Sequence, residues 1–510
     1  MGVISSIEKW AQQRARRFVT WALSGVGADM ILSSEEVKEH KLVALARRYY
    51  AGDHDVKLTE RQKEWMQQHG STVRFTVNHC PTVVDSVVER LNVIGTNTPD
   101  AEQGAEDEAG GWVWRMWKRN RMDAKQRTVY RMAERDGEAF VMVDYDQARG
   151  QVRWLPHQRY VDESAGGDGY GMWMEYPQGD MMQEPERAVK QWSETYVDER
   201  GKEQVRVRRT VYYPDRIERY VRGRGGEWEP FEETAEDGTV TPSKVAWVDG
   251  AGRPLGIPVA HFYVPGRKSA LSEIIPLQDM LNKAWLDIMA AVDTTGFGMV
   301  ATLGFIPTTD GRPPESDGSN LMKIAPGQWF GTLKPPSEAA IQQINPASLQ
   351  PLLETEDRIV VRIASVSDTP LSRFMTSRQI AAEGTLKQQE APLLAKCKER
   401  MTLYGNAWED VFAVSMRLAV HFGGEELDPD LTVEVVWDEI EMRNDMAYRQ
   451  ALLMEKHMGV PDDKLQEKLG YTKDEIAAFR RRNLLAIADN IRQMPLLREV
   501  TADEPDAATA

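Results

Sequence analysis

The sequence has 510 residues, a formal net charge of −16 and a pI of about 5.2. A chain of this length is expected to fold as several packed units, and its acidity argues against a protein whose whole surface grips a phosphate backbone. Its two cysteines, Cys80 and Cys397, are too few and too far apart for a disulfide framework or, by themselves, a thiolate metal site, which favours a reducing compartment. The mean hydropathy is −0.51, and no apolar run approaches the ~18 residues of a spanning helix, so no transmembrane helix is expected.

An arginine pair followed by a short apolar run at 16–28 resembles a twin-arginine signal. Two hydroxyl residues interrupt that run, however, and a phenylalanine follows the pair directly. We therefore interpret the segment as a surface helix that docks through Trp10, Phe18 and Trp21.

The first half of the chain has the pattern of an α/β region. Helices are predicted at 37–56, ending near Gly52, and at 78–95, with Asn78 as the N-cap and Pro81 in the first turn. The acidic, glycine-rich run that follows is interpreted as a solvated, mobile loop. The remaining predicted elements are that loop at 101–111, a helical pair at 112–137, a strand at 138–146 and mostly β structure over 151–265.

The second half shows clearer helical periodicity. After Ser272, apolar residues recur at alternating steps of three and four, and the Gly- and Pro-rich run after Gly296 predicts a small excursion with short strands. A second helix is predicted with Asn345 as cap and Pro346 in its first turn. A third is predicted from Ser377 towards Phe422, bent near Pro392. A strand and short helices are predicted beyond it.

No arrangement of residues in the sequence indicates a catalytic centre. His54, His69 and His79 lack metal-ligand spacing. The run GGDGYG at 166–171 lies between predicted strands with no helix after it, which favours a hairpin turn over a phosphate cradle. Cys397 falls in an apolar helical stripe, as a packed core thiol would. These observations predict a protein that is not an enzyme and has no cofactor and no metal.

Two basic, aromatic stretches allow either nucleic-acid binding or a structural role. At 112–123 the spacing of Trp114, Trp117 and Arg121 fits a half-buried helix better than a nucleic-acid patch. At 205–226 arginine alternates with valine or tyrosine, which predicts a two-sided strand whose arginines form a solvated or subunit-facing edge.

The order of several short segments is similar to that in portal proteins of tailed double-stranded-DNA bacteriophages, in particular the Gp6-like portal family. The resemblance covers roughly residues 40–480, and its specificity comes from the order and spacing of the segments. They are YYAGDH, NHCPTVVDSVVERLNVIG, ERDGEAFVMVDYD, YYPDRIERY, GIPVAHFYVPGRKSALSEIIPLQDMLNKAWLDIMAAVDTTG, SVSDTPLSRF and GVPDDKLQEKLGYTKDEIAAF.

The resemblance implies an α+β portal fold with a helical stem, an α/β clip and wing, a long bent helix and an α-helical crown. The implied boundaries are 1–265 for the N-terminal wing region, 266–297 for the first stem helix, 298–345 for the clip, 346–366 for the second stem helix, 367–377 for the tunnel loop, 378–439 for the long wing helix and strand, 440–492 for the crown and 493–510 for a disordered tail. It assigns no role to 101–111 or 222–240.

The same resemblance implies three groups of functional residues. In the stem, an apolar stripe partly buried between neighbouring subunits would comprise Ile274, Leu277, Leu281, Ala284 and Ile288. In the clip, docking of partners would involve Asp310, Arg312, Glu315 and Asp317. The tunnel loop would line the DNA channel with Asp368, Thr369, Pro370, Leu371, Ser372, Arg373, Phe374 and Thr376, of which Phe374 is expected to pack the loop against the helix behind it.

The implied assembly is a dodecameric homo-oligomer at one capsid vertex of the virion, put together in the host cytoplasm. Double-stranded DNA would pass through it during packaging and ejection. Its implied partners are the terminase large subunit, a head-completion or adaptor protein, and the major capsid and scaffolding proteins, with no membrane. From the residues alone, an unrelated oligomeric virion scaffold or adaptor without a DNA channel remains the alternative.

Overall fold

The computed structural model describes most of the chain, with gaps. The described residues are 34–55, 76–99, 108–160, 170–181, 183–197, 201–223, 227–234, 240–296, 299–304, 306–309, 312–313, 315, 335, 337–344, 348–375, 383–441, 445–469, 476 and 479–482. The helix predicted at 16–28 lies outside them. The chain divides into two compact units, Met1–Ile440 and Glu441–Ala510.

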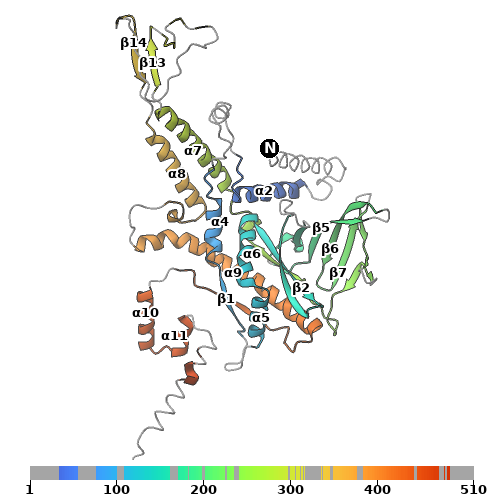
Figure 1. The fold of residues 1–510 in the computed structure, drawn as a ribbon. Coiled ribbons are helices and arrows are strands. Elements are labelled where there is room, and N and C mark those ends of the chain that lie inside the picture. The colour runs from blue at the N-terminus through green and yellow to red at the C-terminus, as the bar shows by residue number, and fades with distance from the viewer. Residues whose placement is uncertain are drawn as a thin grey trace, which may run out of the picture. The chain divides into compact units, whose positions relative to one another are not determined.

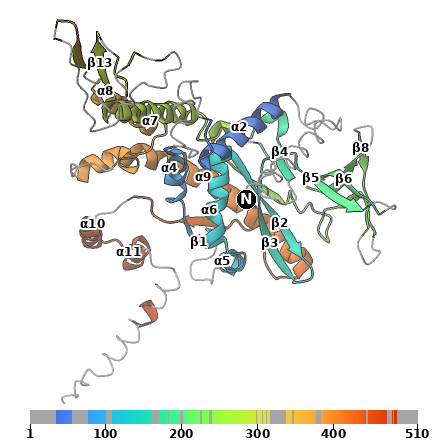
Figure 2. The same ribbon diagram turned by 45° about the horizontal axis from the view of Figure 1, so that its top comes forward.

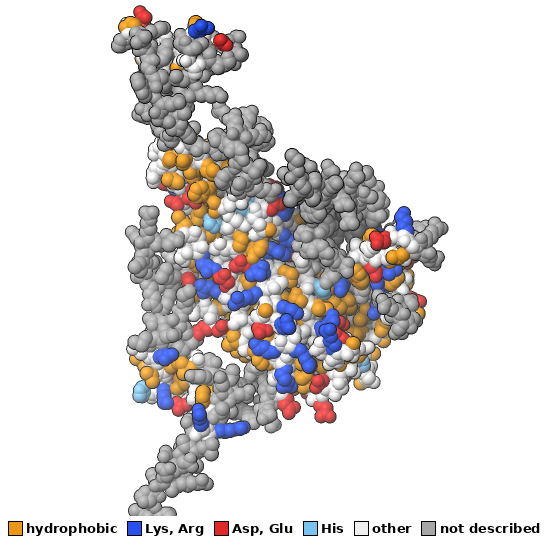
Figure 3. Space-filling model, in the orientation of Figure 1, with side chains coloured by type: hydrophobic (Ala, Val, Ile, Leu, Met, Phe, Trp, Pro, Cys, Tyr) orange, Lys and Arg blue, Asp and Glu red, His pale blue; other side chains and the backbone are white. Residues whose placement is uncertain are grey.

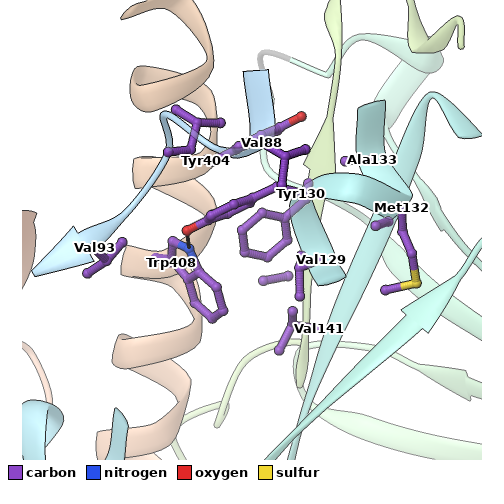
Figure 4. Packing of buried hydrophobic residues seen from close by; sticks show 14 of the residues in the cluster. Val88, Val93, Val129, Tyr130, Met132, Ala133, Val141, Tyr404 and Trp408 are labelled. Atoms are coloured by element: carbon purple, nitrogen blue, oxygen red, sulfur yellow. Dashed lines mark hydrogen bonds between the residues drawn. The ribbon is translucent and has the colours of Figure 1, made fainter. Parts of the chain in front are cut away.

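The centre of the first unit is a three-stranded antiparallel sheet with helices packed on it. The sheet has the order β12-β2-β3, with β2 Glu138–Asp146, β3 Gln151–Gln158 and β12 Val259–Tyr263. Helices α6 (Met122–Asp136) and α9 (Glu383–Gly423) pack against it (Figures 1 and 2). Trp408 of α9 and Tyr130 of α6 are fully buried, and the indole Nε1 donates to the tyrosine oxygen over 2.9 Å (Figure 4). This core holds the long helix against the sheet.

Helix α9 follows the stripe that the sequence predicts. Cys397, Tyr404, Trp408, Val411 and Leu418 are all buried, and the helix runs through Pro392. The predicted cap of this helix, residue 377, lies outside the described residues. Burial raises the pKa of the Cys397 thiol to about 11, so the group remains protonated at neutral pH, as the prediction of a core thiol requires.

The helix predicted at 78–95 is shorter than expected. Helix α4 spans Cys80–Val88, and the following residues form strand β1, Val93–Asn97. This strand pairs antiparallel with β15, Glu434–Trp437, far away in the sequence. The prediction was wrong at this end because a long-range strand partner overrode the local apolar spacing. Asn78 still accepts a hydrogen bond from the Cys80 amide at 3.0 Å, near the predicted cap.

The prediction of a loop at 101–111 was wrong for its last residues. Helix α5 begins at Glu108 and runs to Arg119, and its first turn buries Ala109 and Gly110. The Thr96 hydroxyl of β1 donates to the Gly110 carbonyl over 2.8 Å, so the small residues allow close contact with the strand. Further along, Trp117 is fully buried, which agrees with the predicted half-buried helix.

A larger antiparallel sheet forms from residues 170–246. Its order is β11-β7-β6-β5-β4, with β8 on β7. The expectation of an arginine edge was wrong, because β6 lies inside the sheet. Arg208 is buried with its guanidinium 5.1 Å from the Trp192 ring, so part of the charge is stacked on an aromatic face. The strands are β4 Tyr170–Glu175, β5 Arg187–Val197, β6 Glu203–Tyr212, β7 Arg216–Arg222, β8 Trp228–Pro230 and β11 Lys244–Ala246, with a separate pair, β9 Glu233–Thr234 and β10 Val240–Thr241.

The remaining elements of the first unit include a helical hairpin. Helix α7 (Ile274–Gly296) and helix α8 (Gln350–Val366) lie side by side, and strands β13 (Met299–Leu303) and β14 (Ala340–Ile344) pair at the end of the two helices (Figures 1 and 2). Helix α8 begins later than predicted, and Pro351 takes the first-turn position that we assigned to Pro346. Helix α2 spans Ser34–Tyr50, and single 3-10 turns lie at Pro177–Gly179, Pro265–Arg267 and Leu371–Arg373.

The second unit contains two described helices, α10 (Asp445–His457) and α11 (Asp462–Lys468). Leu452 and Leu465 are buried within it. Taken with the first unit, the structure has the mixed helix and sheet content of the predicted α+β class. No helix in the described part of the chain is both long and apolar enough to cross a membrane.

Candidate functional site

The base of helix α7 is attached to the rest of the first unit by buried amide side chains. Gln278 and Asn282 are both fully buried. The Val77 amide donates to Asn282 Oδ1 over 3.1 Å, and the His79 amide donates to Gln278 Oε1 over 3.0 Å. Leaving such a buried group unpaired costs about 1–3 kcal/mol, so these bonds fix the helix to the segment before α4.

His54 belongs to the same network. Its ring Nδ1 lies 2.7 Å from Asn282 Nδ2, and its Nε2 lies 3.0 Å from the Tyr49 carbonyl. The amide donates to Nδ1 and the ring Nε2–H donates to the carbonyl, so both ring nitrogens have a partner. His54 was expected only to lack metal-ligand spacing, and the two amides were not predicted from the sequence. Their spacing of four residues in an otherwise apolar helix was the available signal.

The predicted stem stripe faces the interior of the chain itself. Ile274, Leu281 and Ile288 are at most 5% exposed, and Leu277 and Ala284 are partly buried. Leu281 belongs to the main hydrophobic core, so its burial is complete within one subunit. The expectation that this stripe is shared between neighbouring subunits was therefore wrong for Leu281.

Some apolar side chains of the hairpin remain exposed to solvent within one subunit. Orange side chains gather over the α7–α8 pair in Figure 3. The exposed apolar residues on the two helices have exposed fractions between 38% and 55% and are Met280, Val292, Leu353, Val361 and Val366. We call these five residues the outer stem face. Exposed apolar side chains on a helix pair are candidates for contact with another protein chain.

The described part of the predicted clip is exposed at its tip. Arg312 and Glu315 are exposed, whereas Asp310 and Asp317 lie outside the described residues. Leu303 and Ile306 are more than half exposed. At Gly304 the backbone φ is +78°, and a Cβ would lie 1.9 Å from the Glu338 carbonyl oxygen, so only glycine fits where the two chain segments approach.

The loop after α8 is only partly exposed. Thr369 and Pro370 are buried, and the Thr369 hydroxyl donates to the Ser367 carbonyl over 3.3 Å. Asp368, Ser372 and Arg373 are exposed, Leu371 is half-buried, and Thr376 lies outside the described residues. Of the residues predicted to line the channel, Asp368, Ser372 and Arg373 are therefore the described ones whose side chains are exposed within one subunit. The Thr369 hydroxyl already has a partner in its own loop.

Phe374 packs the loop onto the rest of the fold, as expected. Its ring meets the His79 ring edge-on with centroids 5.3 Å apart, and it packs against the main core. Burial lowers the pKa of His79, so this ring stays neutral at physiological pH. The aromatic contact fixes the position of the arginine that precedes Phe374.

Arg373 is paired with helix α4. Its Nη2 forms an ion pair with Glu89, and its Nε donates to Ser86 Oγ at 3.4 Å. Arg373 and Glu89 line an open surface depression of about 340 Å³. Its other lining residues are Pro81, Thr82, Asp85 and Ser372. Asp85 is itself bound by Arg131 Nε at 3.0 Å. Sequence reasoning found Arg373 but not its acidic partner, which lies 284 positions away.

The described residues do not define a reaction centre at this site. No group of three or more His, Cys, Asp or Glu side chains among them could hold a metal ion. The thiol of Cys80, at the start of α4, is buried, and that burial raises its pKa to about 12. These charged and apolar side chains can bind and position another molecule.

Comparisons with known proteins connect this arrangement with phage particles. A family model described as phage portal protein, SPP1 Gp6-like, matches residues 181–470. The portal protein of Mycobacterium phage D29 is 23% identical over 410 residues, covering 78% of this chain and 76% of the relative. The portal protein of Mycobacterium phage L5 is 21% identical over 406 residues, with the same coverage of both chains.

Two solved structures are also similar. A chain in the neck of an empty GTA particle computed with C6 symmetry has a TM-score of 0.37 and 12% identity, covering 81% of this chain and 94% of that one. An HK97 family phage portal protein from Corynebacterium diphtheriae has a TM-score of 0.27 and 12% identity, covering 70% and 90%.

The family match and the curated relatives define the class as a structural protein of the phage virion. The family model covers more than half of the 510 residues, and the chain belongs to the SPP1 Gp6-like family of phage portal proteins. This confirms the resemblance found from the order of its segments. Portal proteins are components of a capsid vertex.

Proposed function

We propose that twelve copies of this chain form a ring around a channel through which double-stranded DNA is packaged and later ejected. The observation that carries this proposal is the α7–α8 hairpin, in a chain of the portal family, with apolar side chains that its own subunit leaves exposed. In this role the protein positions DNA and partners and is not an enzyme. The family match also leaves no support for an unrelated scaffold.

The outer stem face supports contact between subunits. Its five side chains lie on both helices of the hairpin, so neighbouring copies in a ring could cover them. Removing apolar surface from water contributes roughly 25 cal/mol per Å². Repeated around a closed ring, this contact would stabilise the assembly without any change in the subunit core.

The segment between the stem helices is proposed as the docking site for partners. It carries exposed charged and apolar side chains, including Arg312, Glu315 and Ile306. Exposed loops on a rigid scaffold commonly carry binding functions. In the proposed sequence of events, the terminase large subunit docks here first and a head-completion or adaptor protein replaces it.

The loop at 367–377 is proposed to face the DNA. Its exposed Arg373 and Ser372 can make backbone contacts that are independent of base sequence. Each phosphate that a cation neutralises adds affinity, so a chain with net charge −16 and a single described arginine in this loop would let DNA slide. The long helix and strand would belong to the wing and residues 440–492 to the crown, with capsid and scaffolding proteins as further partners during assembly in the host cytoplasm.

The channel assignment is tested by substituting Arg373→Glu in the phage genome. Arg373 is 41% exposed and lies outside the main core, so we expect the ring to form normally. Repulsion of phosphate should then reduce DNA packaging or retention, measured as the fraction of particles that hold a full genome. Full particles in normal number across a range of salt would show that Arg373 has no electrostatic role in the channel.

A further inference from the structure

The arginine proposed to meet DNA already has an anionic partner within its own subunit. Glu89 is the C-cap residue of α4, and its carboxylate pairs with Arg373 Nη2. A negative charge at the carboxyl end of a helix is unfavourable beside the helix dipole. Arg373 therefore offsets a local excess of negative charge, and Glu89 already occupies a hydrogen-bond donor of the guanidinium.

From this geometry we infer that Glu89 competes with DNA phosphate for Arg373, and so sets how firmly the channel loop holds the DNA. This inference rests on the proposed function of the loop. A carboxylate and a phosphate both accept charge-assisted hydrogen bonds from a guanidinium. Each arginine can thus exchange one anion for another as DNA moves past, and no copy has to remain without a partner.

The exchange requires only a side-chain movement. Phe374 and Leu371 pack against the main core and hold the backbone on either side of Arg373. The side chains of Arg373 and Glu89 are 41% and 55% exposed, so both can turn towards solvent. Rotation of exposed side chains takes picoseconds to nanoseconds, which is fast compared with any movement of a loop or domain.

The neighbouring carboxylate is not an equivalent competitor. Asp85 lies in the same depression, but it accepts hydrogen bonds from Arg131 Nε at 3.0 Å and from the Tyr50 hydroxyl at 3.0 and 3.1 Å. These two donors engage both of its oxygens. Glu89 is therefore the acidic residue whose removal should release Arg373.

The expected size of the effect follows from the exposure of the pair. Exposed ion pairs contribute about 0.2–1 kcal/mol, and occupying a binding group lowers its apparent affinity by the fraction that is occupied. Glu89→Gln should thus tighten DNA binding by up to about fivefold for each engaged arginine, since 1 kcal/mol corresponds to about fivefold. Several engaged copies in one ring would multiply this gain.

The test measures binding of a short blunt double-stranded DNA to the assembled ring, as a function of salt. Four proteins are compared with the parent: Glu89→Gln, Arg373→Gln, the double variant, and Glu425→Gln. Glu425 is exposed, so this last variant changes the net charge equally without touching Arg373. We expect tighter binding for Glu89→Gln than for Glu425→Gln, weaker binding for Arg373→Gln, and no gain from Glu89→Gln in the Arg373→Gln background.

The outcomes separate this inference from the function on which it rests. Weaker binding by Arg373→Gln, with Glu89→Gln no different from Glu425→Gln, would overturn the competition and leave the DNA contact standing. A gain from Glu89→Gln that persists without Arg373 would also overturn it, because the effect would then be one of general charge. Unchanged binding by Arg373→Gln would contradict the channel role itself. Thermal unfolding of each variant checks that differences in binding do not arise from lost folding.

Discussion

Two substitutions on the stem hairpin separate subunit folding from ring formation. Leu281 is fully buried in the core of its own subunit, with 0% of it accessible to solvent, so Leu281→Ala removes apolar contacts within one chain. Truncations of this kind cost about 2–5 kcal/mol. We expect a lower free energy of unfolding for the subunit, while rings still form in native buffer.

Val361→Asp should have the opposite pattern. Val361 is 48% exposed, so the change should alter subunit stability by no more than about 0.5 kcal/mol. If the outer stem face contacts a neighbour, however, the same carboxylate is buried without a partner in every copy of the ring. The cost is then several kcal/mol per interface, and the expected product is a folded monomer or small oligomer.

Sedimentation velocity reports the assembly of both variants, and urea denaturation reports the stability of the subunit. Thr355→Asp places the same charge at an exposed polar position on the same helix and serves as the control. Normal rings from Val361→Asp would refute the assignment of the outer stem face. Loss of rings from Leu281→Ala without loss of subunit stability would refute the burial argument.

Replacing 308–318 by a short Gly-Ser link should leave rings intact but weaken binding of the terminase or head-completion protein, and unaltered binding would reject the clip assignment. Burial, with a smaller effect of Lys190, lowers the pKa of His157 to about 3. Below about pH 6.5 the unfolded chain therefore binds a proton at this histidine that the folded chain does not. The free energy of unfolding should then fall as the pH decreases, by about 2 kcal/mol at pH 5. Urea denaturation at pH 7 and 5 should show a smaller difference for His157→Gln, and an equal difference would contradict the argument. Because each chain has a formal charge of −16, rings should dissociate more readily at low than at moderate salt, as measured by sedimentation.

The periodic parts of the fold could be predicted because the signal is local. The apolar stripe through Tyr404 and Trp408 specified helix α9, and the Gly- and Pro-rich run after Gly296 indicated an excursion with short strands. Such patterns depend only on which residues repeat along one face.

Contacts between distant segments could not be predicted in this way. Nothing near Val93 indicates pairing with Trp437, and that pairing decides strand over helix. Likewise, the stripe through Leu281 showed that one face of α7 is buried but not whether the same chain or a neighbour covers it. The ion pair of Arg373 with Glu89 depends on how the loop after α8 meets the distant helix α4, so the sequence indicated the arginine but not its partner.

The central claim is that this chain forms a ring with an open channel. Electron microscopy of the purified full-length protein in negative stain tests it most directly. Averaged end-on views should show a closed ring with a central stain-filled hole, wide enough for a DNA duplex. Particles that average to an asymmetric monomer, or to a closed body without a hole, at moderate salt and protein concentration would contradict the account.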